Sequence, residues 1–330
     1  MFQVDEGDLG RTLTVIEEGR RAGLHSGAQL AVSIEGRRVA DVAAGDVTVA
    51  TDMNWLSTTK IVTAIAVGQL WERGEFDLDE RVADHVPAFG ANGKGSVTIR
   101  HLLTHTGGFR SGDAAVDRVG EQGWDAVVSA ICAAPLEPGW VPGHKAGYHV
   151  HAGTIMLAEI VRLVTGRPFR DHAREAVLDP LGAEGFSVES WPSRSGRGPA
   201  SALLRVLELL AGRGEREGMR LLQPQTVDAM AAHQRVGMHD HTFGAVMDWG
   251  LGFVLDTKYA LGDRLQPYGY GRHASSRTFG HSGAQSSVGL VDPEHALAVA
   301  LVFNGTPGEA AHTQRQHDVL TALYEDLHLV

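Results

Sequence analysis

Cysteine is almost absent from this chain, because Cys132 is the one cysteine among 330 residues. A disulfide within the chain and a zinc site built from thiolates both need more than one cysteine, so both are excluded. Cys132 lies within the apolar run 127–133, and we expect it to pack in a core. Aromatic residues are scarce as well, at 6%, so those near a functional site are candidates for its walls.

The sequence also lacks a long apolar run and a cluster of basic residues. Its longest clean apolar run, 296–303, is far shorter than the roughly 18 residues of a membrane-spanning helix, so we expect no membrane partner. Forty acidic against 29 basic residues give a net charge of -11, and the scatter of the basic ones argues against nucleic acid as a partner. Residues 1–8 lack the positive flank and apolar stretch of a secretory signal, so we expect a cytoplasmic protein.

Hydrophobic residues make up 43% of the sequence, which is enough for buried cores, and the length predicts two domains of about 150 residues each. Residues 193–199, rich in Ser, Gly and Arg, are expected to form a surface loop. Alternating or continuous apolar runs predict a hairpin over 29–45 and strands over 251–255, 286–291 and 296–303. Apolar residues at helical spacing predict helices over 9–22, 57–73, 124–134, 151–165, 201–211 and 310–327.

The order of these elements predicts the fold class. Segments from both ends of the chain, 1–50 and 245–330, would form one discontinuous domain, an antiparallel sheet flanked by helices. The stretch 51–244 would form a mainly helical domain between them. We therefore predict an α/β (α+β sandwich) fold with an active site in the cleft between the two domains.

Ser57 and Lys60 are the first candidates for chemistry. They begin the helix predicted over 57–73, and residues three apart on a helix are neighbours, so the Lys60 amine can reach the Ser57 hydroxyl. A serine becomes a nucleophile when a base takes its proton, and burial can lower the pKa of a lysine enough for that role. Chance alone gives about 0.2 Ser-x-x-Lys matches in such a composition, so a plain helix cap at Ser57 and a solvated Lys60 stay open.

Two further segments indicate how such a site would be completed. Tyr148 stands between a Pro-Gly turn and a predicted helix, which suits a group held rigidly at the edge of a cleft. Residues 279–284, which read Phe-Gly-His-Ser-Gly-Ala, precede the predicted strand pair. An exposed edge strand at this point could present backbone N–H groups to a substrate carbonyl.

With these segments the chain resembles the serine β-lactamase and penicillin-binding-protein superfamily, in particular its class C-like branch with family VIII-type esterases and related acyltransferases. The loop 97–108 and shorter stretches at 180–182, 223–227 and 292–304 follow in the order typical of that branch. The resemblance covers about residues 26–304 and implies a β-lactamase/transpeptidase-like fold. We expect no cofactor.

The resemblance assigns roles by motif. Ser57 would be the acylated nucleophile and Lys60 its proton acceptor, whereas Tyr148 would shuttle protons and His281 opens the third motif. The backbone N–H groups of Ser57 and Ala284 would form the oxyanion hole. Residues beside the motifs are expected to contact the substrate, namely Trp55, His149, Val150, Ser282 and Gly283.

Two departures from the family pattern bear on the substrate. Val150 replaces the asparagine of the family's Tyr-x-Asn element, which removes a side-chain amide and weakens a lactamase or peptidase interpretation. His281 stands where many members have lysine, as is common among the esterase-like ones. It would attract a substrate carboxylate only when protonated, and the ordinary pKa of histidine leaves open whether His281 is protonated near pH 7.

Seventeen histidines invite a metal hypothesis, above all at 144–151 and 238–241. Neither group has a recognised ligand spacing, so we expect no metal. His149 and His151 would either line the cleft or satisfy local hydrogen bonds. Residues 258–278 would form either a flap over the substrate or a hairpin on the edge of their own domain.

The leading hypothesis is a cytoplasmic esterase that forms an acyl-enzyme at Ser57 from a small-molecule ester or amide. A transacylase that passes the acyl group to an amine or alcohol acceptor in secondary-metabolite biosynthesis is the first alternative. A catalytically silent relative that binds a ligand through the same cleft is the second, although Ser57, Lys60 and Tyr148 argue against it.

Overall fold

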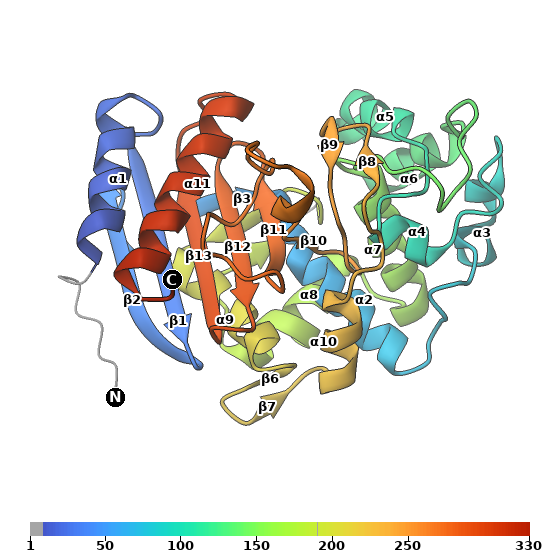
Figure 1. Cartoon of the computed structure of the whole chain (residues 1–330). Coiled ribbons are helices and arrows are strands. Elements are labelled where there is room, and N and C mark those ends of the chain that lie inside the picture. The colour runs from blue at the N-terminus through green and yellow to red at the C-terminus, as the bar shows by residue number, and fades with distance from the viewer. Residues whose placement is uncertain (1–8, 190) are drawn as a thin grey trace.

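A six-stranded antiparallel sheet forms one half of the computed structural model, which describes residues 9–189 and 191–330 (Figure 1). The strand order β10-β11-β12-β13-β1-β2 brings strands from both ends of the chain side by side. These strands are β1 (Gly27–Ile34), β2 (Arg37–Gly45), β10 (Val254–Leu255), β11 (Phe279–Gly283), β12 (Ser287–Asp292) and β13 (Leu297–Phe303). The segment 1–8, interpreted above for the absence of a secretory signal, lies outside the described residues.

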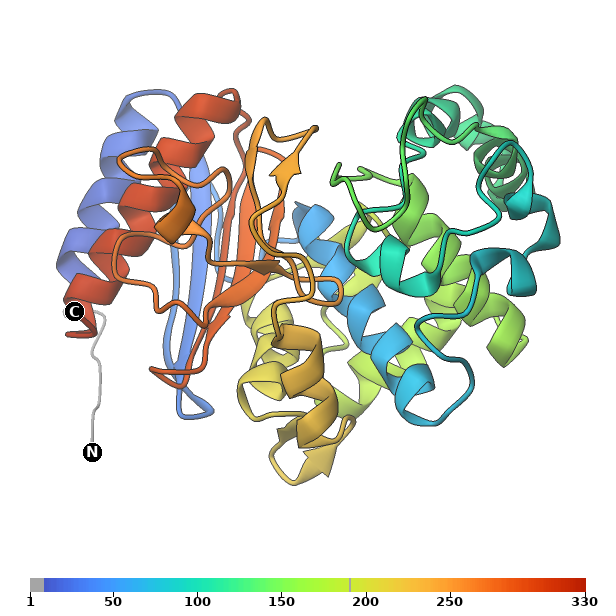
Figure 2. The same ribbon diagram turned by 45° about the vertical axis from the view of Figure 1, so that its right-hand side comes forward.

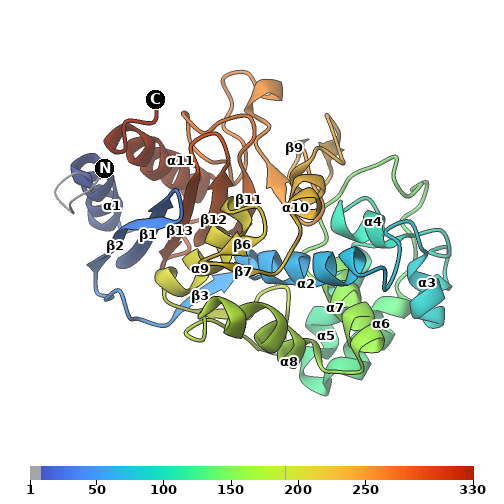
Figure 3. The same cartoon turned by 90° about the horizontal axis from the view of Figure 1, so that it is seen from below.

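Helices cover both faces of this sheet. Figure 3 shows α1 (Gly10–Arg21) and α11 (Glu309–Asp326) together on one face and α9 (Ala200–Ala211) on the other. α9 packs against β1, β12 and β13 although it falls within the range 51–244 predicted to be a separate helical domain. The domain boundaries at residues 50 and 245 stay a prediction.

Strand β13 lies inside the sheet and is apolar on both faces. Leu297, Val299 and Leu301 pack in the core beneath α1 and α11, whereas Ala298 and Ala300 pack in the core that includes α9. Successive side chains of a strand point to opposite faces, so a strand covered on both faces is a continuous apolar run. The structure thereby confirms the central strand predicted over 296–303.

The other half of the molecule is built around α2 (Lys60–Glu72), which Figure 2 shows surrounded by other helices. Every residue from Lys60 to Leu70 is buried, as expected of a helix that is packed on all sides. The remaining helices are α3 (Val82–His85), α4 (Ile99–Leu103), α5 (Ser111–Val119), α6 (Trp124–Ala133), α7 (Ala152–Thr165), α8 (Phe169–Ala173) and α10 (Pro224–Ala231).

Short strands and single helical turns make up the rest of the regular structure. The short strands are β3 (Met53–Leu56), β4 (Ser187–Val188), β5 (Gly196–Gly198), β6 (Glu215–Arg216), β7 (Met219–Arg220), β8 (His239–Asp240) and β9 (Ala245–Val246). The turns are η2 (Ser57–Thr59), η3 (Pro87–Gly90), η4 (Gly120–Gln122), η5 (Arg174–Leu178), η6 (Asp179–Leu181) and η7 (Lys258–Ala260).

The predicted antiparallel sheet, its flanking helices and the long helices of the middle segment are confirmed, whereas two local predictions were wrong. The strand over 251–255 is reduced to β10, because Gly252 has a φ of +83°, which no extended strand can accommodate. Residues 193–199 are not a surface loop, because they contain β5, which pairs with β3, and Ser193 is buried. In the described part of the chain, no helix is both long and apolar enough to cross a membrane.

Candidate active site

Ser57 lies at a strained turn between a strand and a helix. β3 ends at Leu56, whose φ of 45° is in the left-handed region that side chains with a Cβ rarely adopt. The chain then enters η2 and continues directly into α2. Backbone strain of this kind is concentrated at functional sites. The turn places Ser57 on the wall of a cavity of 590 Å³.

Lys60 is buried directly behind this serine. Its Nζ donates to Ser57 Oγ at 2.8 Å and to the backbone carbonyl of Ser193 at 3.0 Å. Burial lowers the pKa of the Lys60 amine to about 7, with Asp113 acting to raise it and Arg194 to lower it further. A neutral amine is therefore accessible near pH 7, and it is placed to accept the proton of Ser57.

Ser193 is a contact that sequence reasoning missed. It belongs to the segment interpreted as a surface loop, and nothing in its composition marked it as part of a site. Its hydroxyl lies 3.0 Å from Nδ1 of His151, whose pKa burial and Lys60 lower to about 3. Of the two alternatives for His151, the structure therefore supports local hydrogen bonding.

Tyr148 lines the same cavity as Ser57. Lys60 Nζ lies 5.2 Å from the centre of its ring, and no described residue forms a hydrogen bond with its hydroxyl. Burial raises the pKa of the Tyr148 hydroxyl well above its ordinary value, an effect that the Ser57 hydroxyl offsets in part. The phenol is therefore protonated near pH 7 and has a proton to donate.

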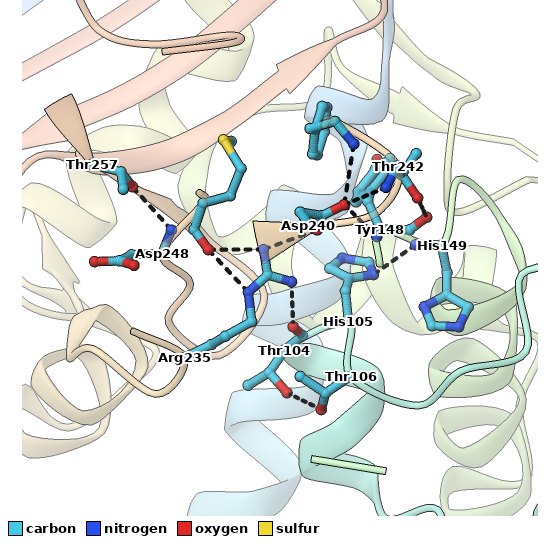
Figure 4. A network of polar contacts seen from close by, with 12 residues as sticks. Thr104, His105, Thr106, Tyr148, His149, Arg235, Asp240, Thr242, Asp248 and Thr257 are labelled. Atoms are coloured by element: carbon cyan, nitrogen blue, oxygen red, sulfur yellow. Dashed lines mark hydrogen bonds and ion pairs between the residues drawn. The ribbon is translucent and has the colours of Figure 1, made fainter. Parts of the chain in front are cut away.

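A buried ion pair holds the backbone of Tyr148, as Figure 4 shows. Asp240 Oδ1 accepts the Tyr148 N–H at 3.1 Å, and Oδ2 accepts from Arg235 Nη2 at 2.9 Å. Arg235 also donates to the carbonyls of Thr104 and Met247, and burial lowers its pKa to about 10. Asp240 thus has a positioning role that its place in a histidine-rich stretch did not reveal.

Asp113 fixes the chain that follows Tyr148. Its carboxylate accepts the backbone N–H groups of Val150, His151 and Ala152 at distances from 2.7 to 3.0 Å. These N–H groups belong to the first turn of α7 and the residues before it, which have no acceptor within a helix. A carboxylate at this end also interacts favourably with the helix dipole. Sequence reasoning missed this residue, which lies on α5.

His281 is buried in β11 and also lines the cavity. Burial and the nearby Lys60 lower its pKa to about 3, so the imidazole is neutral at physiological pH. Its Nδ1 lies 2.9 Å from the Ser282 carbonyl, which fixes the proton there and leaves Nε2 as an acceptor with no partner among the described residues. The protonation left open above is therefore excluded, and His281 supplies no charge to attract a carboxylate.

Gly283 permits β11 to approach the turn that carries Ser57. A Cβ at this position would lie 2.3 Å from the Trp55 carbonyl oxygen and 2.3 Å from Ser287 Oγ. Ala284, the next residue, lines the cavity together with Ser57. An oxyanion hole formed by the N–H groups of Ser57 and Ala284 stays a prediction.

The predicted substrate contacts at Trp55 and His149 were wrong. Trp55 is fully buried in the core, and its indole N–H donates to the Gly198 carbonyl at 2.8 Å. His149 is also fully buried, and its Nε2 accepts the Phe109 N–H at 3.2 Å. By contrast, Val150 and Ser282 line the cavity, and their contact with a substrate stays a prediction.

Aromatic and apolar side chains form most of the remaining wall. Phe243 and Met247 come from the segment around β8 and β9, and Leu265, Pro267 and Tyr268 come from the segment 258–278. The hairpin predicted as one alternative for this segment was wrong, because residues 258–278 contain no strand. They line the cavity while Tyr270 packs in the core, and movement of the segment as a flap stays a prediction. Among residues 9–189 and 191–330, no group of three or more His, Cys, Asp or Glu side chains is arranged to hold a metal ion.

Comparison with known proteins identifies relatives over almost the whole chain. A family profile described as Beta-lactamase matches residues 14–323. A Mycobacterium tuberculosis protein named esterase/beta-lactamase LipL is 26% identical over 87% of this chain and 78% of its own length.

Solved structures show the same fold. A family VIII carboxylesterase superposes with a TM-score of 0.80 at 23% identity, covering 98% of both chains. EstCE1, described as a hydrolase with promiscuous acyltransferase activity, superposes with a TM-score of 0.78 at 19% identity, covering 96% of this chain and 99% of its own.

Proposed function

This chain belongs to the beta-lactamase family of hydrolases, and from that membership we propose that it is a serine carboxylesterase that forms an acyl-enzyme at Ser57. The observation that carries the proposal is the 2.8 Å contact between the Lys60 amine and the Ser57 hydroxyl. Because the pKa of that amine is about 7, a large fraction of it is neutral near pH 7 and can accept the serine proton.

Acylation begins when Ser57 Oγ attacks the carbonyl carbon of the ester and its proton passes to Lys60 Nζ. The carbonyl oxygen becomes an oxyanion, for which the N–H groups of Ser57 and Ala284 are the proposed donors. When the intermediate collapses, the bond to the alcohol oxygen breaks. That oxygen takes the proton of the Tyr148 hydroxyl, which is replaced from the Lys60 ammonium.

Deacylation repeats these transfers with water. Lys60 takes a proton from the water molecule that attacks the acyl carbon, and the bond from that carbon to Ser57 Oγ then breaks. Ser57 recovers a proton from the Lys60 ammonium, and the acid product leaves. Because burial keeps Tyr148 protonated, its phenol serves as a proton donor in this scheme and Lys60 serves as the base.

The cavity supports an ester over a lactam or a peptide as substrate. Those substrates commonly carry a carboxylate, and no Lys or Arg belongs to the described residues that line this cavity. His281 is neutral, and Val150 offers no amide to hold a substrate amide. The names of the relatives, an esterase/beta-lactamase and a family VIII carboxylesterase, agree with this choice.

Acyl transfer to an amine or alcohol is a second candidate, favoured by the described acyltransferase activity of EstCE1. A cavity of 590 Å³ is within the usual range for small-molecule sites and has room for an acyl group with its acceptor. Partition of the acyl group between water and an added amine or alcohol separates the two candidates. The cytoplasmic location and a place in secondary-metabolite biosynthesis stay predictions.

The test is covalent labelling of Ser57. A fluorophosphonate probe should add one label to the native protein, located at Ser57 by peptide mass spectrometry, and p-nitrophenyl butyrate should be hydrolysed. Ser57→Ala should lose both reactions, whereas Ser129→Ala, on the exposed face of α6, should keep both. Equal behaviour of the native protein and Ser57→Ala would favour a catalytically silent relative instead.

A further inference from the structure

The cavity beside Ser57 has one charged side chain among the described residues that line it, and that side chain is the carboxylate of Glu309. Glu309 is the first residue of α11 and is exposed. The nearest catalytic cation, Lys60, is buried behind the serine and is held by Ser57 and Ser193. Among the described residues, Glu309 therefore gives the cavity wall a negative charge.

Two neutral groups hold the Glu309 carboxylate in place. The Tyr268 hydroxyl donates to Oε2, and the Gln285 side-chain amide donates to Oε1 at 3.2 Å. Neither donor carries a charge, and Glu309 forms no ion pair with any described residue. A carboxylate that is positioned but not neutralised can pair with a cation that comes from outside.

Aromatic rings line the cavity next to this carboxylate. The Phe243 and Tyr268 rings lie 5.9 Å apart in an edge-to-face arrangement, and the Tyr148 and Phe243 rings lie 5.2 Å apart. The face of an aromatic ring attracts a cation, and quaternary ammonium groups are commonly bound by several rings together. Aromatic residues make up 6% of the chain, yet three of them border this cavity.

We propose that the natural substrate is an ester that carries an ammonium group, bound between the Glu309 carboxylate and the rings of Tyr268 and Phe243. This inference rests on the proposed esterase function and specifies its substrate class. The net charge of -11 acts in the same direction, because a negative protein attracts cationic ligands at a distance. An anionic ester would meet repulsion at the same wall.

The test compares esters that differ in charge and share one shape. One pair is acetylcholine and its analogue in which carbon replaces the quaternary nitrogen, which tests a cation on the alcohol. The other pair is the p-nitrophenyl ester of γ-trimethylammoniobutyrate and its carbon analogue, which tests a cation on the acyl group. We expect kcat/KM to favour the charged member of at least one pair by about tenfold or more, and added salt to reduce that preference.

Glu309→Gln removes the charge and keeps the shape of the side chain, with its amide oxygen able to accept one of the two hydrogen bonds, so it should abolish the preference for the charged ester within each pair. Glu75→Gln removes the same charge from an exposed position away from the cavity and should keep the preference. Hydrolysis of both pairs without preference, or a preference that survives in Glu309→Gln, would overturn this inference alone. Hydrolysis of p-nitrophenyl butyrate without hydrolysis of any of the four esters would also overturn this inference alone, whereas failure to hydrolyse p-nitrophenyl butyrate as well would overturn the proposed function, and this inference with it.

Discussion

The backbone carbonyl of Ser193 accepts a hydrogen bond of 3.0 Å from the side-chain amine of Lys60. The amine is therefore held between this carbonyl and the hydroxyl of Ser57, with the Tyr148 ring on a further side. A backbone carbonyl cannot take up or lose a proton, so it fixes the amine without competing for the proton of the nucleophile. In the proposed mechanism, the protonation state of Lys60 then determines whether Ser57 can be activated.

Activity should accordingly rise with pH and level off above the pKa of Lys60. Below a pKa of about 7 the amine is protonated and cannot accept a proton, so kcat/KM for a neutral ester should fall about tenfold per pH unit. Initial rates with p-nitrophenyl butyrate across neutral pH would measure this profile. Lys60→Arg keeps a positive charge at all these pH values, so it should lose about 10²- to 10⁴-fold in kcat at every pH. A native profile that stays flat through pH 7 would contradict a role for Lys60 as the base.

Tyr148→Phe should lower kcat and leave KM nearly unchanged. The substitution removes a hydroxyl that has no hydrogen-bond partner among the described residues, so it leaves no buried group unsatisfied and should preserve the free energy of unfolding. Loss of the proton relay should lower kcat by about 10²- to 10⁴-fold. Tyr270→Phe is the matched control, since its hydroxyl donates to the Val254 carbonyl in the core, and kcat should remain close to that of the native protein. Native kcat in Tyr148→Phe would contradict the relay.

Spacing along the chain was sufficient to predict the central pair of this site. Ser57 and Lys60 are one helical turn apart, so their contact depends on local geometry alone. Ser193 and Asp240 could not be predicted in this way, because they reach Lys60 and Tyr148 across 133 and 92 positions of sequence. Such contacts depend on how the halves of the molecule pack, which no local pattern records.

Proximity in sequence also misled at two positions. Trp55 precedes Ser57 and His149 follows Tyr148, so both were expected in the cleft. Neighbouring side chains of extended backbone point in opposite directions, and a residue beside a catalytic one can therefore face the core. His149 does so against Phe109, whereas Trp55, two residues before Ser57, faces the core because the chain turns at Leu56, whose φ is 45°, before it reaches Ser57.

The buried pair of Arg235 and Asp240 should be essential for stability. Asp240→Asn would leave a guanidinium without a counter-charge in the interior, which typically costs about 3 to 5 kcal/mol of unfolding free energy. Asp228→Asn breaks an exposed pair, because the Asp228 side chain is 50% exposed and that of its partner Arg213 is 61% exposed. This substitution should cost less than about 1 kcal/mol of unfolding free energy. Urea denaturation of both variants would measure the difference. Equal losses would show that the buried pair has no special role.

Gly283→Ala adds a single methyl group, yet it should lower kcat strongly. The new Cβ would lie 2.3 Å from the Trp55 carbonyl and from Ser287 Oγ, so β11 must move away from the turn that carries Ser57. Ala284 would move with it, and loss of one oxyanion donor typically lowers kcat by about 10²- to 10³-fold. Gly10→Ala, where nothing lies within 4 Å of the added Cβ, should leave kcat unchanged. If Gly283→Ala folds and keeps native kcat, the N–H of Ala284 is not part of the oxyanion hole.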